Sequence, residues 1–227
     1  MGETGAEVDE PVVLEPRWPI AVALSIYIGI TMAIRVTVHH RSTLGPAWLV
    51  PMVEVALLAA LVAAHPSKVE TRATWLRPQA IVLIITLVGM AIASSAVLIS
   101  DLITGAKVTE SATSLLASGA LIWMGNALAF GLLYWELDSG GPLARAHRVA
   151  AYPDFAFSQQ LSPELAPPGW LPRYVDYLVL GITTSTAFSP TDVMPMRPWA
   201  KLAMSVQSLI SVIVIGLVIA RAVNVFS

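Results

Sequence analysis

The sequence predicts an all-α protein, a polytopic bundle of transmembrane helices with five full spans and one short crossing or re-entrant helix. Two observations predict this class. Apolar residues make up 56% of the 227 residues and charged residues only 12%, with a mean hydropathy of +0.72. A soluble domain carries about twice that share of charged residues. The apolar residues also form continuous runs of bilayer length, whereas the strands of a membrane barrel alternate.

Five runs are long enough to cross, because a bilayer core requires about 20 apolar residues in a helix. They are Trp18–Val38, Leu44–Ala64, Gln79–Ile99, Ala112–Tyr134 and Trp199–Phe226. A further apolar piece, Tyr174–Phe188, is short for a crossing, so it either crosses or enters the bilayer and turns back. The first run is expected to be retained rather than cleaved as a signal peptide, because the segment before it is acidic.

The chain divides into four parts. These are an acidic N-terminal tail (1–17), a region of four transmembrane helices (18–134), a Pro/Gly-rich loop (135–173), and a C-terminal part with a short helix, a polar turn and the last span (174–227). The prolines and glycines of the loop exclude one long helix. We expect its aromatic patch, Tyr152 to Phe157, to lie on the membrane surface or to pack against helix ends; alternatively, the loop binds a protein partner.

The distribution of basic residues predicts the orientation. If the N-terminus is cytoplasmic, the cytoplasmic segments contain Arg17, Lys68, Arg72, Arg77, Arg145, Arg148 and Arg173, and the outer ones contain Arg35, Arg41 and Lys107. Cytoplasmic loops are enriched in Lys and Arg, so this orientation is favoured. Arg outnumbers Lys, and Ala and Val are abundant, as in proteins from GC-rich bacterial genomes. The sequence therefore predicts a bacterial cytoplasmic membrane protein.

Several classes of function are excluded or unsupported. A net charge of −2 gives no basic surface for nucleic acid, and the absence of Cys excludes thiolate metal sites. His39 and His40 are adjacent, so they point apart on a helix and cannot easily share a metal ion. No phosphate-binding, dinucleotide-binding or nucleophile motif occurs, so we expect no cofactor and no metal. An enzyme would require residues scattered over several helices.

Glu54 lies inside the predicted span Leu44–Ala64, where a charge is costly without a partner. Arg35, near the end of the preceding span, is the natural partner. The pair would orient two helices or form a proton or ion site; alternatively, Glu54 is protonated and neutral. Two amides, Asn126 and Gln207, are expected to form hydrogen bonds between helices.

A cluster of polar residues follows the short helix near the C-terminus. Its members are Thr183, Thr184, Ser185, Thr186, Ser189, Thr191 and Asp192. Hydroxyls in such number are out of place on a lipid-facing surface and favour a buried contact or a wet cavity. The sequence thus predicts a polar constriction at 183–192.

Thr183-Thr184, then Asp192-Val193-x-Pro195, Pro198-x-Ala200-Lys201 and a long apolar helix resemble the pore loop and inner helix of potassium-type cation channels. In that family a short pore helix ends in Thr-Thr and precedes a Gly-rich filter. Residues 185–191 contain no glycine here, and the likeness is confined to the segment after Tyr174. The chain also resembles a family of bacterial multi-pass membrane proteins of uncharacterised activity, which end in a similar Phe-x-x-x-Asp-Val segment and last helix.

Three functional hypotheses remain. The first is a channel-like protein, which would be an oligomer because one short helix cannot enclose a pore. The second is a non-catalytic membrane subunit or scaffold with a protein partner at 135–173. The third is an intramembrane enzyme that uses Glu54 and a His. Rows of small residues four apart, such as Ser25 and Gly29 or Gly216 and Ala220, indicate packing within the bundle or a homo-oligomer interface.

Overall fold

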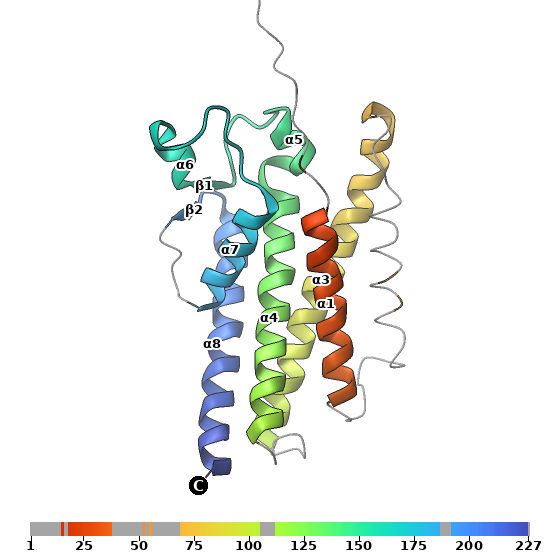
Figure 1. Cartoon of the computed structure of the whole chain (residues 1–227), viewed down its shortest axis with the longest axis vertical. Helices are drawn as coiled ribbons and strands as arrows, with labels where there is room; N and C mark the ends of the chain where they lie inside the picture. The colour runs from red at the N-terminus through yellow and green to blue at the C-terminus, as the bar shows by residue number, and fades with distance from the viewer. Residues whose placement is uncertain are drawn as a thin grey trace, which may run out of the picture.

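The computed structural model describes residues 15, 18–37, 52, 55, 69–104, 112–186 and 192–226. These residues form long helices with a small cap at one end of the bundle (Figure 1). The long helices are α1 (Trp18–Thr37), α3 (Val69–Thr104), α4 (Ala112–Leu137) and α8 (Pro198–Phe226), and a shorter one is α7 (Tyr174–Thr186). The mostly helical fold agrees with the predicted class.

The cap consists of short elements. They are a 3-10 turn at Asp138–Gly140, α5 (Pro142–Ala146), β1 (Phe155–Phe157), α6 (Ser158–Leu161), a 3-10 turn at Pro163–Leu165, and β2 (Val193–Pro195). Gly140 and Gly141 have φ of 84° and 96°, and this left-handed backbone turns the chain sharply from α4 into α5. Two strands pair antiparallel, with Ala156 opposite Met194. The strands were not predicted.

Three helical segments, rather than five, have the length and hydropathy of a full span among the described residues: Ala80–Thr104, Ala112–Gly140 and Pro198–Asn224. They agree with three of the predicted spans. In α1 the apolar part, Trp18–Ala33, is shorter than a full crossing. The predicted span Leu44–Ala64 lies outside the described part of the chain, apart from two isolated residues.

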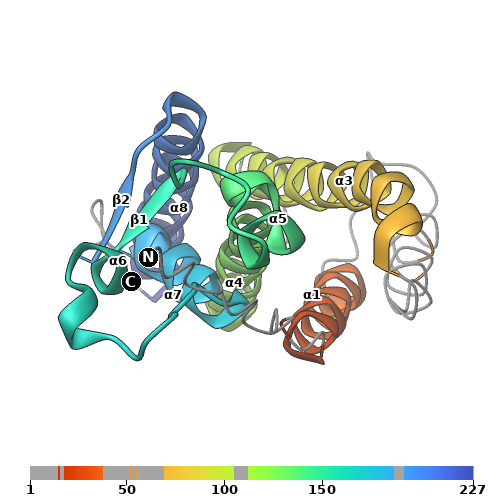
Figure 2. The ribbon, with the colours of Figure 1, turned by 90° about the horizontal axis from the view of Figure 1, so that it is seen from above.

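Helix α4 is the core of the bundle. It contacts α1, α3, α7 and α8, and Figure 2 shows it between them from above. In the most apolar 18-residue stretch of α4, 67% of the residues are buried, whereas the share is 33% in the corresponding stretches of α3 and α8. Large apolar side chains such as Val82, Ile85, Leu202 and Leu209 are exposed on those outer helices. Apolar surface of this extent is typical of a protein that faces lipid.

Helix α7 enters the bundle and the chain then turns back. At its start, Tyr177 contacts the cap residue Asp138 at the end of α4. After α7, β2 pairs with β1, and β1 precedes α7 in the same cap. Both flanks of α7 therefore lie at one end of the bundle, which is the geometry expected for the re-entrant alternative.

Small residues allow α7 to pack closely against α4. A Cβ added at Gly181 would lie 2.5 Å from the backbone oxygen of Ala127, and one at Gly131 would lie 3.2 Å from the backbone oxygen of Tyr177. Close backbone approach of this kind is a common basis of helix association in lipid. The contact lies at residues that the predicted small-residue rows did not include.

The re-entrant path predicts the accessibility of single cysteines, which no native Cys would obscure. Cysteines at Leu165 and Met194, both exposed on the cap, should react with an impermeant thiol reagent from the same side of the membrane. A cysteine at Asn224, near the end of α8, should react only from the other side. Labelling of Leu165→Cys and Met194→Cys from opposite sides would show that α7 crosses.

Gly181→Ala should lower the thermal stability of the detergent-solubilised protein. The added methyl group meets the Ala127 backbone oxygen, and overpacking of this kind costs about 1–3 kcal/mol. Gly216→Ala is the matched control, because no described atom lies within 4 Å of its added Cβ. Equal melting temperatures for the two variants would contradict the close contact.

Candidate functional site

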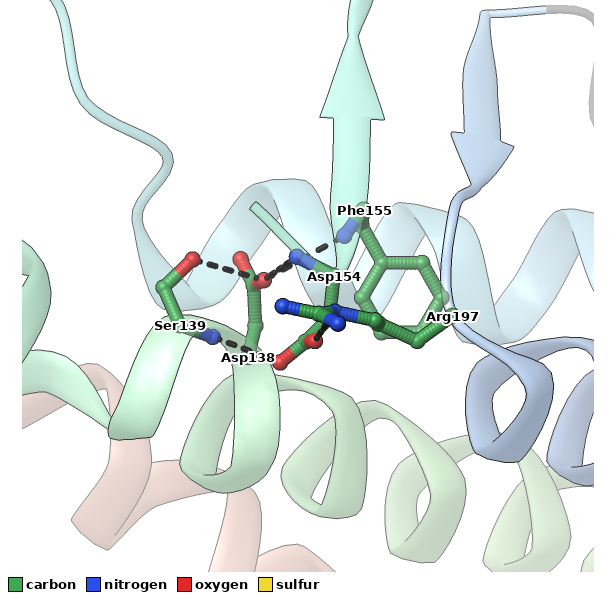
Figure 3. Close-up of polar contacts among 5 residues, drawn as sticks. All are labelled: Asp138, Ser139, Asp154, Phe155 and Arg197. Carbon is green, nitrogen blue, oxygen red and sulfur yellow. Dashed lines mark hydrogen bonds and ion pairs between the residues drawn. The ribbon is translucent and has the colours of Figure 1, made fainter. Parts of the chain in front are cut away.

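The cap is attached to the bundle through Asp138, which is fully buried. Its Oδ1 accepts hydrogen bonds from the backbone N–H of Asp154 at 2.9 Å and of Phe155 at 3.3 Å (Figure 3). Its Oδ2 accepts a short hydrogen bond from the Tyr177 hydroxyl. One carboxylate thus connects α4, the first strand and α7. Burial raises the pKa of the Tyr177 hydroxyl, which therefore remains a donor to Asp138.

Asp154 extends this connection to α8. Its Oδ2 accepts the backbone N–H of Ser139 at 2.9 Å, and its Oδ1 forms an ion pair with Arg197 Nε at 3.2 Å (Figure 3). The Asp154 backbone oxygen also accepts the N–H of Met196 at 2.8 Å. Because Arg197 is largely exposed, the ion pair itself adds little stability. Its effect is to fix the start of α8 beside the end of α4.

Arg145 of α5 is a buried cation, with only 6% of its surface exposed. Its Nη1 donates to the backbone oxygens of Trp135 at 2.5 Å and Asp138 at 2.9 Å. The guanidinium also lies over the Tyr177 ring, 4.9 Å from the centroid, in a cation–π contact. Its Nη2 has no hydrogen-bond partner among the described residues. The described part of the fold therefore bonds Nη1 of this guanidinium and leaves Nη2 without an acceptor.

A cavity of about 420 Å³ lies in the cap beside Arg145. Its walls include Arg148, Gln159, Gln160 and Trp170, together with a run of prolines near the end of the loop. Cavities of this size hold small organic ligands. The cavity is the clearest concave site in the described part of the chain, and no pattern in the sequence indicated it.

The inner end of α7 is closed by side chains from α8 and α4. Gln207, fully buried, donates through Nε2 to the Gly181 backbone oxygen and to Ser185 Oγ, both at 2.8 Å. Ser208 donates to the Thr184 backbone oxygen at 3.0 Å, and Trp123 donates to the Ser185 backbone oxygen at 3.2 Å. The last four carbonyls of a helix have no partner within the helix, and Ser208 and Trp123 satisfy two of them.

The two predicted inter-helix amides are confirmed. The Tyr134 hydroxyl donates to Gln207 Oε1 at 2.6 Å, and Asn126 Nδ2 donates to Ser211 Oγ at 3.0 Å. Both bonds connect α4 to α8 within the bundle. They support packing of these two helices in an environment that offers no water.

Two carboxylates accept hydrogen bonds at the start of α7. Glu15, from the predicted acidic tail, accepts the Tyr174 backbone N–H at 2.5 Å and the Trp135 indole N–H at 2.8 Å. The Asp176 carboxylate accepts the backbone N–H of Arg173 at 2.7 Å. Carboxylates at a helix N-terminus stabilise it through its exposed N–H groups and dipole. Nothing in the sequence pattern indicated the role of Glu15.

The predicted constriction residues lie at the inner end of α7 and beyond it. Thr184 and Ser185 are buried, Thr183 is half-buried, and Thr186 is exposed. Thr183 and Thr186 donate to carbonyls of their own helix, so their hydroxyls are satisfied without water. Asp192 is exposed beside β2, where its backbone oxygen accepts the N–H of Ser158 at 3.0 Å.

Some predicted site residues lie outside the described part of the chain. They are Glu54, Ser189 and Thr191, together with the side chain of Arg35, although the Arg35 backbone belongs to α1. The expected pair of Glu54 with Arg35 therefore stays a prediction.

Comparisons of the whole chain with models of protein families, with curated proteins and with solved structures give no match.

Asp138→Ala should release the cap from the bundle. The substitution leaves the Tyr177 hydroxyl and two backbone N–H groups buried without their acceptor, at a cost of about 1–3 kcal/mol for each group. Cleavage of the cap by trypsin in proteoliposomes should become about tenfold faster or more. Ser139→Ala, which removes only a donor to Asp138, is the control and should keep the native rate. An unchanged rate for Asp138→Ala would refute this role.

Proposed function

We propose that the chain is a non-conducting integral subunit of a bacterial cytoplasmic membrane, and that its cap, within the predicted loop 135–173, binds a partner at the cytoplasmic face. The closed inner end of α7 is the observation that carries the proposal. The backbone oxygens of Gly181, Thr184 and Ser185 and the Ser185 hydroxyl are bonded to side chains of α8 and α4. A segment bonded in this way serves as a structural support for the cap.

Five spans are part of this proposal. Helices α1 and α3 both begin at the cap end of the bundle, and α1 ends at the opposite end (Figure 1). The predicted span Leu44–Ala64 lies in the sequence between these two helices and is long enough to be the fifth crossing.

The position of the charges supports a cytoplasmic cap. Arg145, Arg148, Arg173, Arg197 and Lys201 all belong to the cap or to the start of α8. Arg221, near the end of α8, lies toward the opposite end. Positive residues accumulate on the cytoplasmic side of membrane proteins. With α7 re-entrant and five spans, the C-terminus is then on the outer side.

Exposed apolar side chains on the cap support a protein partner. Tyr152 is 75% exposed and Leu165 is 83% exposed, although neither belongs to a candidate span. A second copy of the chain is a further proposed partner. Gly29 of α1 and Gly216 of α8 lie on exposed faces, and a Cβ added at either would meet no described atom, which suits close helix packing.

A channel-like function is the second candidate, and the re-entrant path of α7 favours it. Several copies would have to surround a pathway at Thr183–Asp192, because a single α7 is packed against α4 and α8. The two candidates differ in whether ions pass through the purified protein.

Ion flux into liposomes that contain the purified chain separates the candidates. We expect flux equal to that of protein-free liposomes, because the Thr184 and Ser185 carbonyls and the Ser185 hydroxyl are bonded to α8 and α4. Thr184→Val and Asp192→Asn should leave the flux unchanged. A flux that requires the protein and changes with either substitution would establish the channel-like function instead.

Partner binding is tested by site-directed cross-linking in the native membrane from Tyr152 and Leu165. A single cross-linked protein in stoichiometric amount, lost on Leu165→Ser, is the expected result. Ile103→Ser is the control, because Ile103 is 73% exposed at the end of α3 away from the cap. Cross-links to lipid alone would reject the partner.

A further inference from the structure

The cap cavity is lined by two arginines and by no acidic residue among the described residues that form its walls. Arg145 is buried, and its Nη2 lacks a hydrogen-bond partner. Arg148 is exposed, and its Nη2 lies within 4.0 Å of the position that a Cβ of Gly169 would occupy, at the wall of the same cavity. The cavity is therefore lined by a buried cation that the fold holds in place and by an exposed cation.

Two glutamines add further donors. The side-chain oxygen of Gln160 accepts the Phe157 backbone N–H at 3.0 Å, and that of Gln159 accepts the Ser158 hydroxyl at 3.2 Å. Each oxygen already accepts one hydrogen bond, and the Nε2 groups of both side chains are donors that a ligand could use. The polar side chains of Arg145, Arg148, Gln159 and Gln160 thus offer the cavity donors and positive charge.

An unpaired buried guanidinium is costly, and an anionic oxygen offsets that cost. Phosphate fits best among anions, since guanidinium groups bind it through paired N–H donors. The cavity of about 420 Å³ is larger than a phosphate group, and Trp170 and several prolines give it apolar walls. The ligand would therefore carry an organic part next to its phosphate.

We propose that this cavity is a binding site for the phosphate group of a small organic phosphate or of an anionic lipid headgroup. The phosphate contacts Arg145 and Arg148, the two glutamine amides donate to its outer oxygens, and the organic part rests on Trp170. The site lies at the end of the bundle where headgroups and soluble metabolites both reach the cap. This inference does not depend on whether the cap also binds a protein partner.

Binding is measured on the full chain in nanodiscs, with two arms that separate the sources. In the first arm the nanodiscs contain only phosphatidylcholine, and inorganic phosphate or glycerol phosphate is titrated at constant ionic strength by calorimetry. In the second arm phosphatidylglycerol replaces part of the phosphatidylcholine, and the melting temperature and the lipid retained after delipidation are measured. Saturable binding in the first arm assigns a soluble ligand, and a higher melting temperature with retained anionic lipid in the second assigns a headgroup.

Arg148→Gln is the decisive variant, because Arg148 is exposed and its side chain forms no hydrogen bond or ion pair with other described residues. It should weaken binding about tenfold or more, as expected for loss of a charged hydrogen bond. Ala150→Trp, which fills the cavity without removing a charge, should also abolish binding. Arg173→Gln, an exposed cap arginine outside the cavity, is the matched control and should bind as the native chain does.

The results that would overturn the proposal are equally specific. Absence of saturable binding in both arms would exclude the site. Equal losses in Arg148→Gln and Arg173→Gln would show attraction by general surface charge only. Binding that survives Ala150→Trp would place the ligand elsewhere.

Discussion

A helix that stops inside a membrane must find hydrogen-bond donors for its last carbonyls, because lipid provides none. In α7, Ser208 donates to the Thr184 carbonyl and Trp123 to the Ser185 carbonyl, while Gln207 donates to the Ser185 hydroxyl. The arrangement requires α4 and α8 to lie on either side of α7, with small residues at the closest contact. The return of the chain to the cap, the pairing of the two strands and the start of α8 beside α4 all depend on this closed end.

The cap shows how one side chain can combine structural and binding roles. Arg145 holds the turn after α4 through two backbone oxygens, and this fixes the guanidinium in place. Arg145 is also one of the residues that line the cavity, and its guanidinium is already held in place there by the fold. A ligand that meets a positioned cation loses less entropy than one that must order a flexible side chain. The contacts that make the cap rigid would thus also favour the proposed binding in the cavity.

Three of the five spans and the short length of α7 could be predicted, because continuous apolar runs and their lengths are local properties of the sequence. Inter-helix bonds by Asn126 and Gln207 could also be predicted in kind, since amides in lipid need partners. Their partners could not, because Tyr134 and Ser211 become neighbours only when α4 and α8 pack. The same holds for Glu15 and for Asp138, whose hydrogen bonds join residues far apart in the chain. Strands of three residues carry too little pattern to be recognised alone.

The donors that close α7 have a consequence for biogenesis. Gln207 and Ser208 follow α7 in the chain, so the ribosome makes α7 before the groups that satisfy its carbonyls. A short apolar helix with open carbonyls is a poor substrate for insertion into lipid on its own. During synthesis α7 would therefore remain at the membrane surface until α8 has been made and inserted. The packing of α7 into the bundle would then be a late step of assembly, because it requires α8 to be in place.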